Sequence, residues 1–135
     1  ASVNSASALY AMEKTFDFGT ISMQNGKVSH KFEMKNDGAE AVTIEKVYTS
    51  CMCTEAFITS TSGKKYGGFG MPGHGDSSKE SIEVKSGETA TVEAIYDPNA
   101  HGPSGVGLAQ RSIYLETNSS QSPKLELSFQ VMVTK

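Results

Sequence analysis

The stretch Lys124-Leu125-Glu126-Leu127-Ser128-Phe129-Gln130-Val131-Met132-Val133 carries the clearest structural signal in the sequence. Large apolar side chains occupy every second position, and all but one of the positions between them are polar. Successive side chains of a β-strand point to opposite faces, so this pattern predicts a strand with one face in a core and the other in solvent. The end of the chain is therefore expected to be a long β-strand.

Shorter segments with the same period fill most of the remaining chain, at 14–21, 28–36, 42–50, 56–61, 81–85, 90–96 and 111–118. Turn sequences separate them, and Asn25-Gly26 is a typical hairpin signal. In 42–50 the parity of the apolar residues changes between Ile44 and Val47, which predicts a bulge or a change of sheet. Together these features predict an all-β fold, an antiparallel immunoglobulin-like β-sandwich of seven to eight strands with a long glycine-rich loop.

The 135 residues are expected to form a single domain over 13–135, preceded by a flexible segment at 1–12. Residues 62–79 lack any periodicity and are predicted to be the long glycine-rich loop, which calls for a functional or flexible explanation. The first residues are small, polar and uncharged, as expected after removal of a leader peptide or at a trimmed boundary. Tryptophan is absent, so the Cys…Trp…Cys signature of antibody domains is missing.

Composition excludes several classes of function. The net charge is −3, with 12 basic residues scattered among 15 acidic ones, so no basic surface is expected to bind nucleic acid. No apolar run approaches the roughly 20 residues that a membrane-spanning helix needs. The sequence contains neither a strand-turn-helix nucleophile nor a phosphate-binding loop, which favours a protein that is not an enzyme.

Both cysteines, Cys51 and Cys53, lie one residue apart where a predicted strand ends. In an extended chain their side chains point the same way and could share one metal ion. Thiolates, thioethers and imidazoles are ligands for copper(I), and zinc is the second choice. His74 and Met71 on the glycine-rich loop, and His101 on a later loop, are the candidates that would complete this site.

Two other interpretations of the cysteine pair stay open. Cysteines often act as small buried apolar residues, and a closely spaced pair can also be a redox dithiol. A disulfide between Cys51 and Cys53 would be strained, because residues two apart in a strand are about 6.5–7 Å apart. His30 shares the apolar face of its predicted strand with Phe32, which favours a hydrogen-bonded core histidine over a ligand.

Several motifs of this chain resemble those of a bacterial family of immunoglobulin-like domains of unknown function. They are Phe16-Asp17-Phe18-Gly19-Thr20-Ile21, Lys35-Asn36-Asp37-Gly38, Ser50-Cys51-Met52-Cys53-Thr54, Ser86-Gly87-Glu88 and Thr117-Asn118. The resemblance implies a sandwich akin to Hydin-type and major-sperm-protein-like domains, and export to the periplasm or cell surface. Met52 replaces the usual glycine of the cysteine motif, and the loop that carries His74 is longer than the family pattern needs.

Two hypotheses for function follow. The first is an exported, non-enzymatic domain that binds a thiophilic metal, copper above zinc, through Cys51, Cys53, His74, His101 and Met71. The second is an adhesion or assembly module of the cell envelope that binds another protein through a sheet edge or the long loops. In the second hypothesis the cysteines are structural or redox-active.

Overall fold

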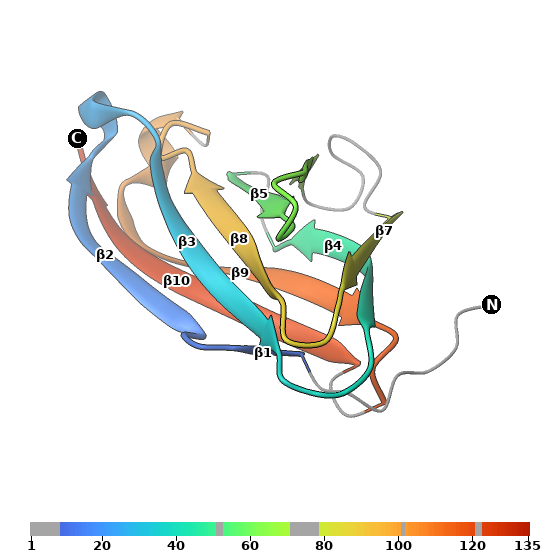
Figure 1. The fold of residues 1–135 in the computed structure, drawn as a ribbon. Helices are drawn as coiled ribbons and strands as arrows, with labels where there is room; N and C mark the ends of the chain where they lie inside the picture. Colours follow the sequence, from blue (N-terminus) through green and yellow to red (C-terminus); the bar gives the residue numbers. More distant parts are fainter. Residues whose placement is uncertain (1–8, 51–52, 71–78, 101, 121–122) are drawn as a thin grey trace.

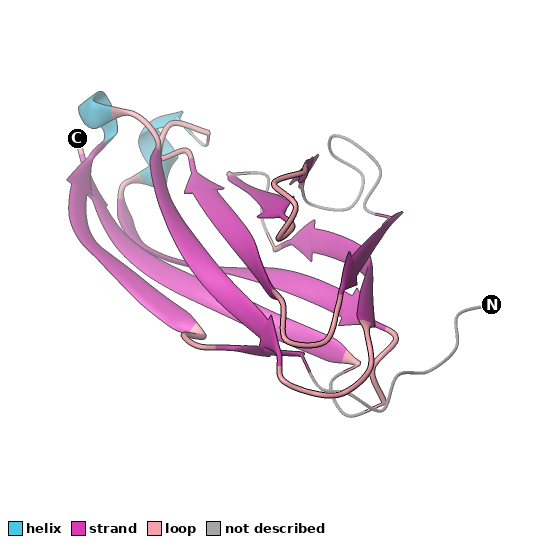
Figure 2. Ribbon diagram, in the orientation of Figure 1, coloured by secondary structure: helices cyan, strands magenta, loops and turns pink. Residues whose placement is uncertain are grey.

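The computed structural model describes residues 9–50, 53–70, 79–100, 102–120 and 123–135. In this part of the chain ten strands form two five-stranded sheets that pack face to face (Figures 1 and 2). The first sheet contains, in spatial order, β1 (Leu9–Ala11), β3 (Val28–Asn36), β8 (Thr89–Tyr96), β5 (Thr54–Thr59) and β6 (Lys65–Phe69). The second contains β2 (Thr15–Ser22), β10 (Lys124–Thr134), β9 (Gly107–Thr117), β4 (Val42–Thr49) and β7 (Lys79–Val84).

Two single-turn 3-10 helices, η1 (Met23–Asn25) and η2 (Gly102–Gly105), complete the described elements. Among the described residues, no helix has the length and apolar character needed to cross a membrane. The architecture confirms the predicted all-β, immunoglobulin-like sandwich.

The core forms between the inner faces of the two sheets, as the period-two patterns predict. Leu127, Phe129, Val131 and Val133 of β10 are all buried. The same alternation on β8 buries its inward residues, which are Ala90, Val92, Ala94 and Tyr96. Each large apolar side chain taken fully out of water contributes about 1.5–3 kcal/mol to folding, so these two strands supply a substantial part of the driving force.

The first strand of the sandwich is divided between the two sheets. β1 pairs with β3 antiparallel, whereas β2 pairs with β10 in parallel. The expectation of a purely antiparallel fold with seven to eight strands is therefore wrong at this pair and too low in number. Among the described residues, the first sheet already includes Leu9, which is buried, although the sequence predicts a flexible segment over 1–12.

The Asn25-Gly26 signal does not make a hairpin. Its residues form η1 and the turn at Gly26, with φ of 81°, but β2 and β3 belong to different sheets. The Ser22 hydroxyl caps this turn by accepting a hydrogen bond from the Gln24 amide at 3.2 Å. A turn sequence specifies local geometry only, and here the pairing of β2 with β10 decides which sheet the strand joins.

The parity change in β4 is a β-bulge, which confirms one of the two predicted explanations. The register of β4 shifts between Ile44 and Lys46 against both of its neighbours, β7 and β9. The extra residue restores the inward direction of the apolar residues, so that Ile44 and Val47 are both fully buried.

The predicted loop over 62–79 contains a strand, β6, at Lys65–Phe69. The pattern is hidden because Gly67 and Gly68 occupy two of its five positions. Glycine at 67 permits close approach, since a Cβ there would lie 2.7 Å from the carbonyl oxygen of Ala56 and 3.0 Å from the Phe57 ring. Residues 71–78 lie outside the described part of the chain.

Asn36, from the Lys35-Asn36-Asp37-Gly38 motif, links the ends of both sheets. Its buried side chain donates hydrogen bonds to the carbonyls of Glu40 and Val84, at 2.7 and 2.9 Å, and accepts one from the Gly38 amide at 3.0 Å. Its backbone amide also donates to the carbonyl of Glu88 at 3.0 Å. One asparagine thus fixes the β3–β4 connection to the β7–β8 turn.

Replacing Asn36 with alanine is expected to lower the free energy of unfolding by about 2–4 kcal/mol, because each buried polar group that loses its partner costs about 1–3 kcal/mol. Urea denaturation of both proteins measures the change. Asn99→Ala is the matched control, because the Asn99 side chain makes one exposed hydrogen bond to the Met23 carbonyl, and we expect it to cost less than about 1 kcal/mol. Equal losses in the two variants would contradict the role assigned to Asn36.

Candidate functional site

The cysteine corner, defined here as residues 49–54, carries the chain from β4 in the second sheet to β5 in the first. Cys53 is only 2% exposed, and its sulfur accepts a hydrogen bond from Nε of Arg111 at 3.1 Å. The Thr54 hydroxyl lies 3.5 Å from the same sulfur. Arg111 belongs to β9, so this contact joins the corner to the opposite sheet.

Hydrogen bonds to backbone groups, some of them from or to side-chain hydroxyls, hold both ends of the corner. The Thr49 hydroxyl donates to the carbonyl of Thr54 at 2.9 Å, and the Asp97 amide donates to the carbonyl of Cys53 at 2.9 Å. Ser50 and Ser112 are joined twice, through the Ser50 amide to the Ser112 carbonyl and through the Ser112 amide to the Ser50 hydroxyl. The backbone that presents Cys53 is therefore tightly positioned.

Chemically, the surroundings of Cys53 have two opposing effects. A guanidinium beside a sulfur stabilises a thiolate, whereas burial stabilises the neutral thiol. Burial also restricts access to reagents and partners. The structure thus places Cys53 as a hydrogen-bonded part of the sandwich interior.

Of the five predicted metal ligands, only Cys53 belongs to the described part of the chain. Cys51, Met71, His74 and His101 lie outside the described residues, and so does Met52. Within the described residues, no group of three or more His, Cys, Asp or Glu side chains is arranged to hold a metal ion. The metal site therefore stays a prediction.

His30 is a hydrogen-bonded histidine at the margin of the core, as its position predicted. Its Nε2 lies 2.5 Å from Oε1 of Glu13, and its ring stacks on Phe16 with centroids 3.6 Å apart. The edges of Phe18 and Phe32 complete the surroundings of the ring. This aromatic cluster fills the side of the sandwich where β2 and β3 lie next to each other (Figure 1).

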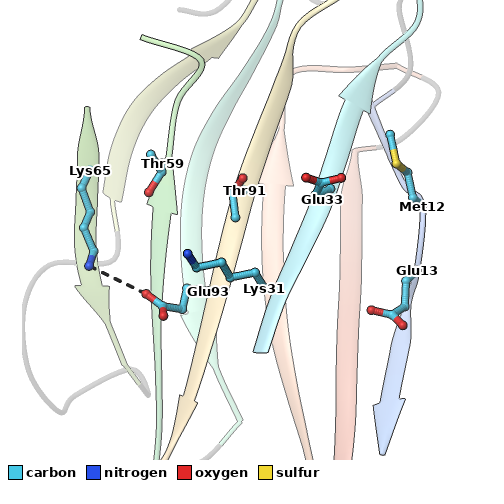
Figure 3. Close-up of a pocket in the computed structure, with 8 residues that line it drawn as sticks. All are labelled: Met12, Glu13, Lys31, Glu33, Thr59, Lys65, Thr91 and Glu93. Atoms are coloured by element: carbon cyan, nitrogen blue, oxygen red, sulfur yellow. Dashed lines mark ion pairs between the residues drawn. The ribbon is translucent and has the colours of Figure 1, made fainter. Parts of the chain in front are cut away.

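A broad open groove lies on the outer face of the first sheet (Figure 3). Its volume is about 640 Å³ and it is lined by Met12, Glu13, Lys31, Glu33, Thr59, Lys65, Thr91 and Glu93. Lysines and glutamates alternate across it, and the Lys65 ammonium lies 3.7 Å from the Glu93 carboxylate. The sequence shows only that these residues alternate with apolar ones along their strands, and that alternation does not show which strands become neighbours and complete a groove.

The edge of β3 beside this groove is only partly covered. β1 pairs with residues 34–36 of β3, and the Met12 amide donates to the Glu33 carbonyl at 3.0 Å. In the described part of the chain, no strand pairs with residues 28–32 on that side. Among the described strands, residues 28–32 of β3 therefore form a stretch of sheet edge that has no paired strand.

A family model described as "Protein of unknown function (DUF1573)" matches residues 9–66, which is less than half of the chain. No curated protein matches this sequence.

Solved structures resemble the whole sandwich at low sequence identity. A protein of unknown function from Porphyromonas gingivalis W83 is 15% identical with a TM-score of 0.68, and the match covers 97% of this chain and 50% of that one. The seventh PapD-like domain of human CEP192 is 14% identical with a TM-score of 0.58, covering 99% and 91% of the two chains. The YadV chaperone is 7% identical with a TM-score of 0.54, covering 94% and 52%.

These likenesses show a PapD-like, immunoglobulin-like fold. The chain spans about half the length of the Porphyromonas gingivalis protein and of YadV.

Two substitutions at Cys53 distinguish a hydrogen-bond acceptor from an apolar filler. In an apolar site, alanine replaces cysteine better than serine does. Here we expect Cys53→Ser to be more stable than Cys53→Ala by about 1 kcal/mol, because the serine oxygen retains an acceptor for Arg111. Urea denaturation under reducing conditions measures both variants, and the opposite order would mean that apolar packing dominates at this position.

Proposed function

We propose that this domain is a non-enzymatic, protein-binding assembly module of the cell envelope, which adds an extended segment of its partner to the edge of β3. The observation that carries the proposal is the combination of a regular strand and an uncovered edge. β3 pairs with β8 over eight consecutive residues without a register shift, and only its last part is covered by β1. A long, regular edge is the template that strand addition requires.

The backbone groups at this edge can be assigned from the pairing. The Glu33 carbonyl accepts from Met12 on the β1 side, whereas the Asn36 amide donates to Glu88 on the β8 side. Because the direction alternates along an antiparallel strand, Ser29 and Lys31 turn their amides and carbonyls toward the uncovered edge. These groups are the hydrogen-bonding partners that an added strand would find.

Side chains at the edge indicate which segments fit. An added strand would place alternate side chains beside His30 and Phe16 on its inner side, where apolar residues are favoured. Its outer side chains would lie beside the lysines and glutamates of the groove, where polar residues are favoured. The partner segment is therefore an extended chain that alternates apolar and polar residues.

Proteins of similar fold support this proposal. YadV is a chaperone, and VesC, a secreted serine protease from Vibrio cholerae, contains a similar sandwich with a TM-score of 0.55. These two proteins, together with the motifs of 16–21 and 50–54, support export of this domain to an extracytoplasmic compartment.

Peptides selected from a displayed library of random twelve-residue sequences test the edge directly. We expect the selected peptides to shift the backbone amide resonances of residues 28–32 in the NMR spectrum. Lys31→Pro removes the N–H that points to the edge and leaves the hydrogen bonds between β3 and β8 in place. It should weaken binding of the selected peptides at least tenfold, or about 1.4 kcal/mol.

Lys31→Ala is the matched control, because it keeps the N–H and removes only the charge; we expect less than a threefold loss. Selected peptides that bind Lys31→Pro as well as the native protein, or that shift resonances elsewhere, would refute strand addition here.

The metal-binding hypothesis is a second proposal, motivated by two cysteines that lie one residue apart in the sequence. Cys51 and Cys53 would be the primary ligands, and His74, His101 or Met71 would complete a copper site, with zinc as second choice. This donor set suits copper(I) because thiolates and thioethers are soft ligands.

Titration of the reduced protein with copper(I), against a competing chelator, tests this second proposal. The Cys51→Ser/Cys53→Ser protein should bind copper(I) at least a hundredfold more weakly, since both thiolates are removed. Met12→Leu is the control, because it removes a sulfur that is distant in the sequence from the two cysteines. Equal and weak binding by the native and double-serine proteins would exclude a metal site at the corner.

A further inference from the structure

The outer face of the second sheet carries an ordered array of side chains that the protein-binding edge does not use. The register of β4, β9, β10 and β2 sets these side chains in rungs across the sheet. One rung contains Tyr48, Tyr114 and Glu126, the next contains Ser112, Ser128 and Thr15, and the third contains Gln110, Gln130 and Asp17. Beyond them Leu108 lies opposite Met132, and both are exposed.

An open groove of about 550 Å³ crosses the middle of this face. Its polar lining contains two carboxylates, one guanidinium, two amides and three hydroxyls, from Asp17, Glu126, Arg111, Gln110, Gln130, Thr15, Ser112 and Ser128. The volume falls within the roughly 300–1,000 Å³ that is usual for small-molecule sites. The groove spans three neighbouring strands, which corresponds to roughly 10 Å across the sheet.

Hydrogen bonds hold several of these side chains in place. The Gln130 amide donates to the Asp17 carboxylate at 2.9 Å, and the Gln110 amide approaches the Gln130 oxygen at 3.5 Å. The Ser112 hydroxyl donates to the Glu126 carboxylate at 2.8 Å. The groups are therefore oriented before any ligand arrives, which lowers the entropy cost of binding.

Aromatic surface borders the groove on one side. Tyr48 and Tyr114 stack with ring centroids 5.1 Å apart, and the Lys124 ammonium lies 4.9 Å from the Tyr114 centroid. A hydrogen bond with Tyr48 raises the pKa of Lys124 above its ordinary value. On the other side, Leu108 and Met132 offer apolar contact.

We infer that this groove binds a neutral oligosaccharide. Hydroxyl, amide and carboxylate groups match the paired hydroxyls of a sugar, because each can donate to or accept from them. The apolar faces of sugar rings suit the tyrosine and Leu108–Met132 borders. An apolar ligand would leave the polar lining without partners. The two carboxylates of the lining, Asp17 and Glu126, outnumber its single guanidinium, Arg111, so the charge balance disfavours an anionic ligand.

Titration with defined oligosaccharides tests this inference. Cellohexaose, chitohexaose and maltohexaose are the neutral probes, and hexagalacturonate is the anionic one. We expect at least one neutral probe to bind at millimolar concentration or below, with NMR shifts concentrated at Gln110, Ser112, Ser128 and Gln130. Gln110→Ala should weaken that binding at least fivefold, whereas Thr91→Ala in the groove of the opposite sheet should leave it unchanged.

Circular dichroism and thermal unfolding verify that Gln110→Ala remains folded, and Ser128→Ala provides a second variant in the same groove. The inference is overturned if no neutral probe binds, if hexagalacturonate binds as well as the best neutral probe, or if both groove variants bind as tightly as the native protein. Shifts confined to the first sheet would also overturn it. None of these results bears on the β3 edge, whose test uses peptides and Lys31 variants.

Discussion

Each time the chain passes from one sheet to the other, its backbone amides and carbonyls leave the hydrogen bonds of the first sheet and must find new partners. The rest of the structure depends on how these groups are paired at each crossing. Between β1 and β2, the Met12 amide still bonds to Glu33 of the first sheet, while the Lys14 carbonyl already accepts from Ser128 of the second. At the cysteine corner, the Thr49 hydroxyl bonds to the carbonyl of Thr54 across the crossing. The sandwich is stable at its sides because the backbone amides and carbonyls at these crossings have hydrogen-bond partners close by.

The motifs that resemble an unknown-function family mostly have structural roles of this kind. Asp17 accepts a hydrogen bond from the Gly19 amide at 2.7 Å, where φ is 74° and where the register between β2 and β10 shifts. Asn118 exchanges two hydrogen bonds with the backbone of Thr43, and Asn36 joins two turns. Such residues identify a fold, because they fix its turns and bulges, and they leave the chemistry of the surfaces open.

Function is therefore sought mainly on the surfaces of the sandwich, where only a few motif residues, such as Asp17, take part. The two outer faces differ in character: lysines and glutamates alternate on the first sheet, whereas amides, hydroxyls and two carboxylates line the groove of the second. The uncovered half of β3 offers backbone groups in place of side chains. One small domain thus presents an edge suited to an extended peptide and, on its other sheet, a face suited to a sugar. The two surfaces would work independently, because they lie on different sheets.

From the sequence alone, the fold class could be predicted, together with most strands, an irregularity in β4 (a bulge or a change of sheet) and the hydrogen-bonded His30. These features depend on the alternation of side chains along one strand, which is a local property. The partner of β2, the strand hidden at Gly67, the contact between Arg111 and Cys53 and both grooves could not be predicted. Each of these depends on which strands become neighbours, and that is decided by packing between residues far apart in the chain.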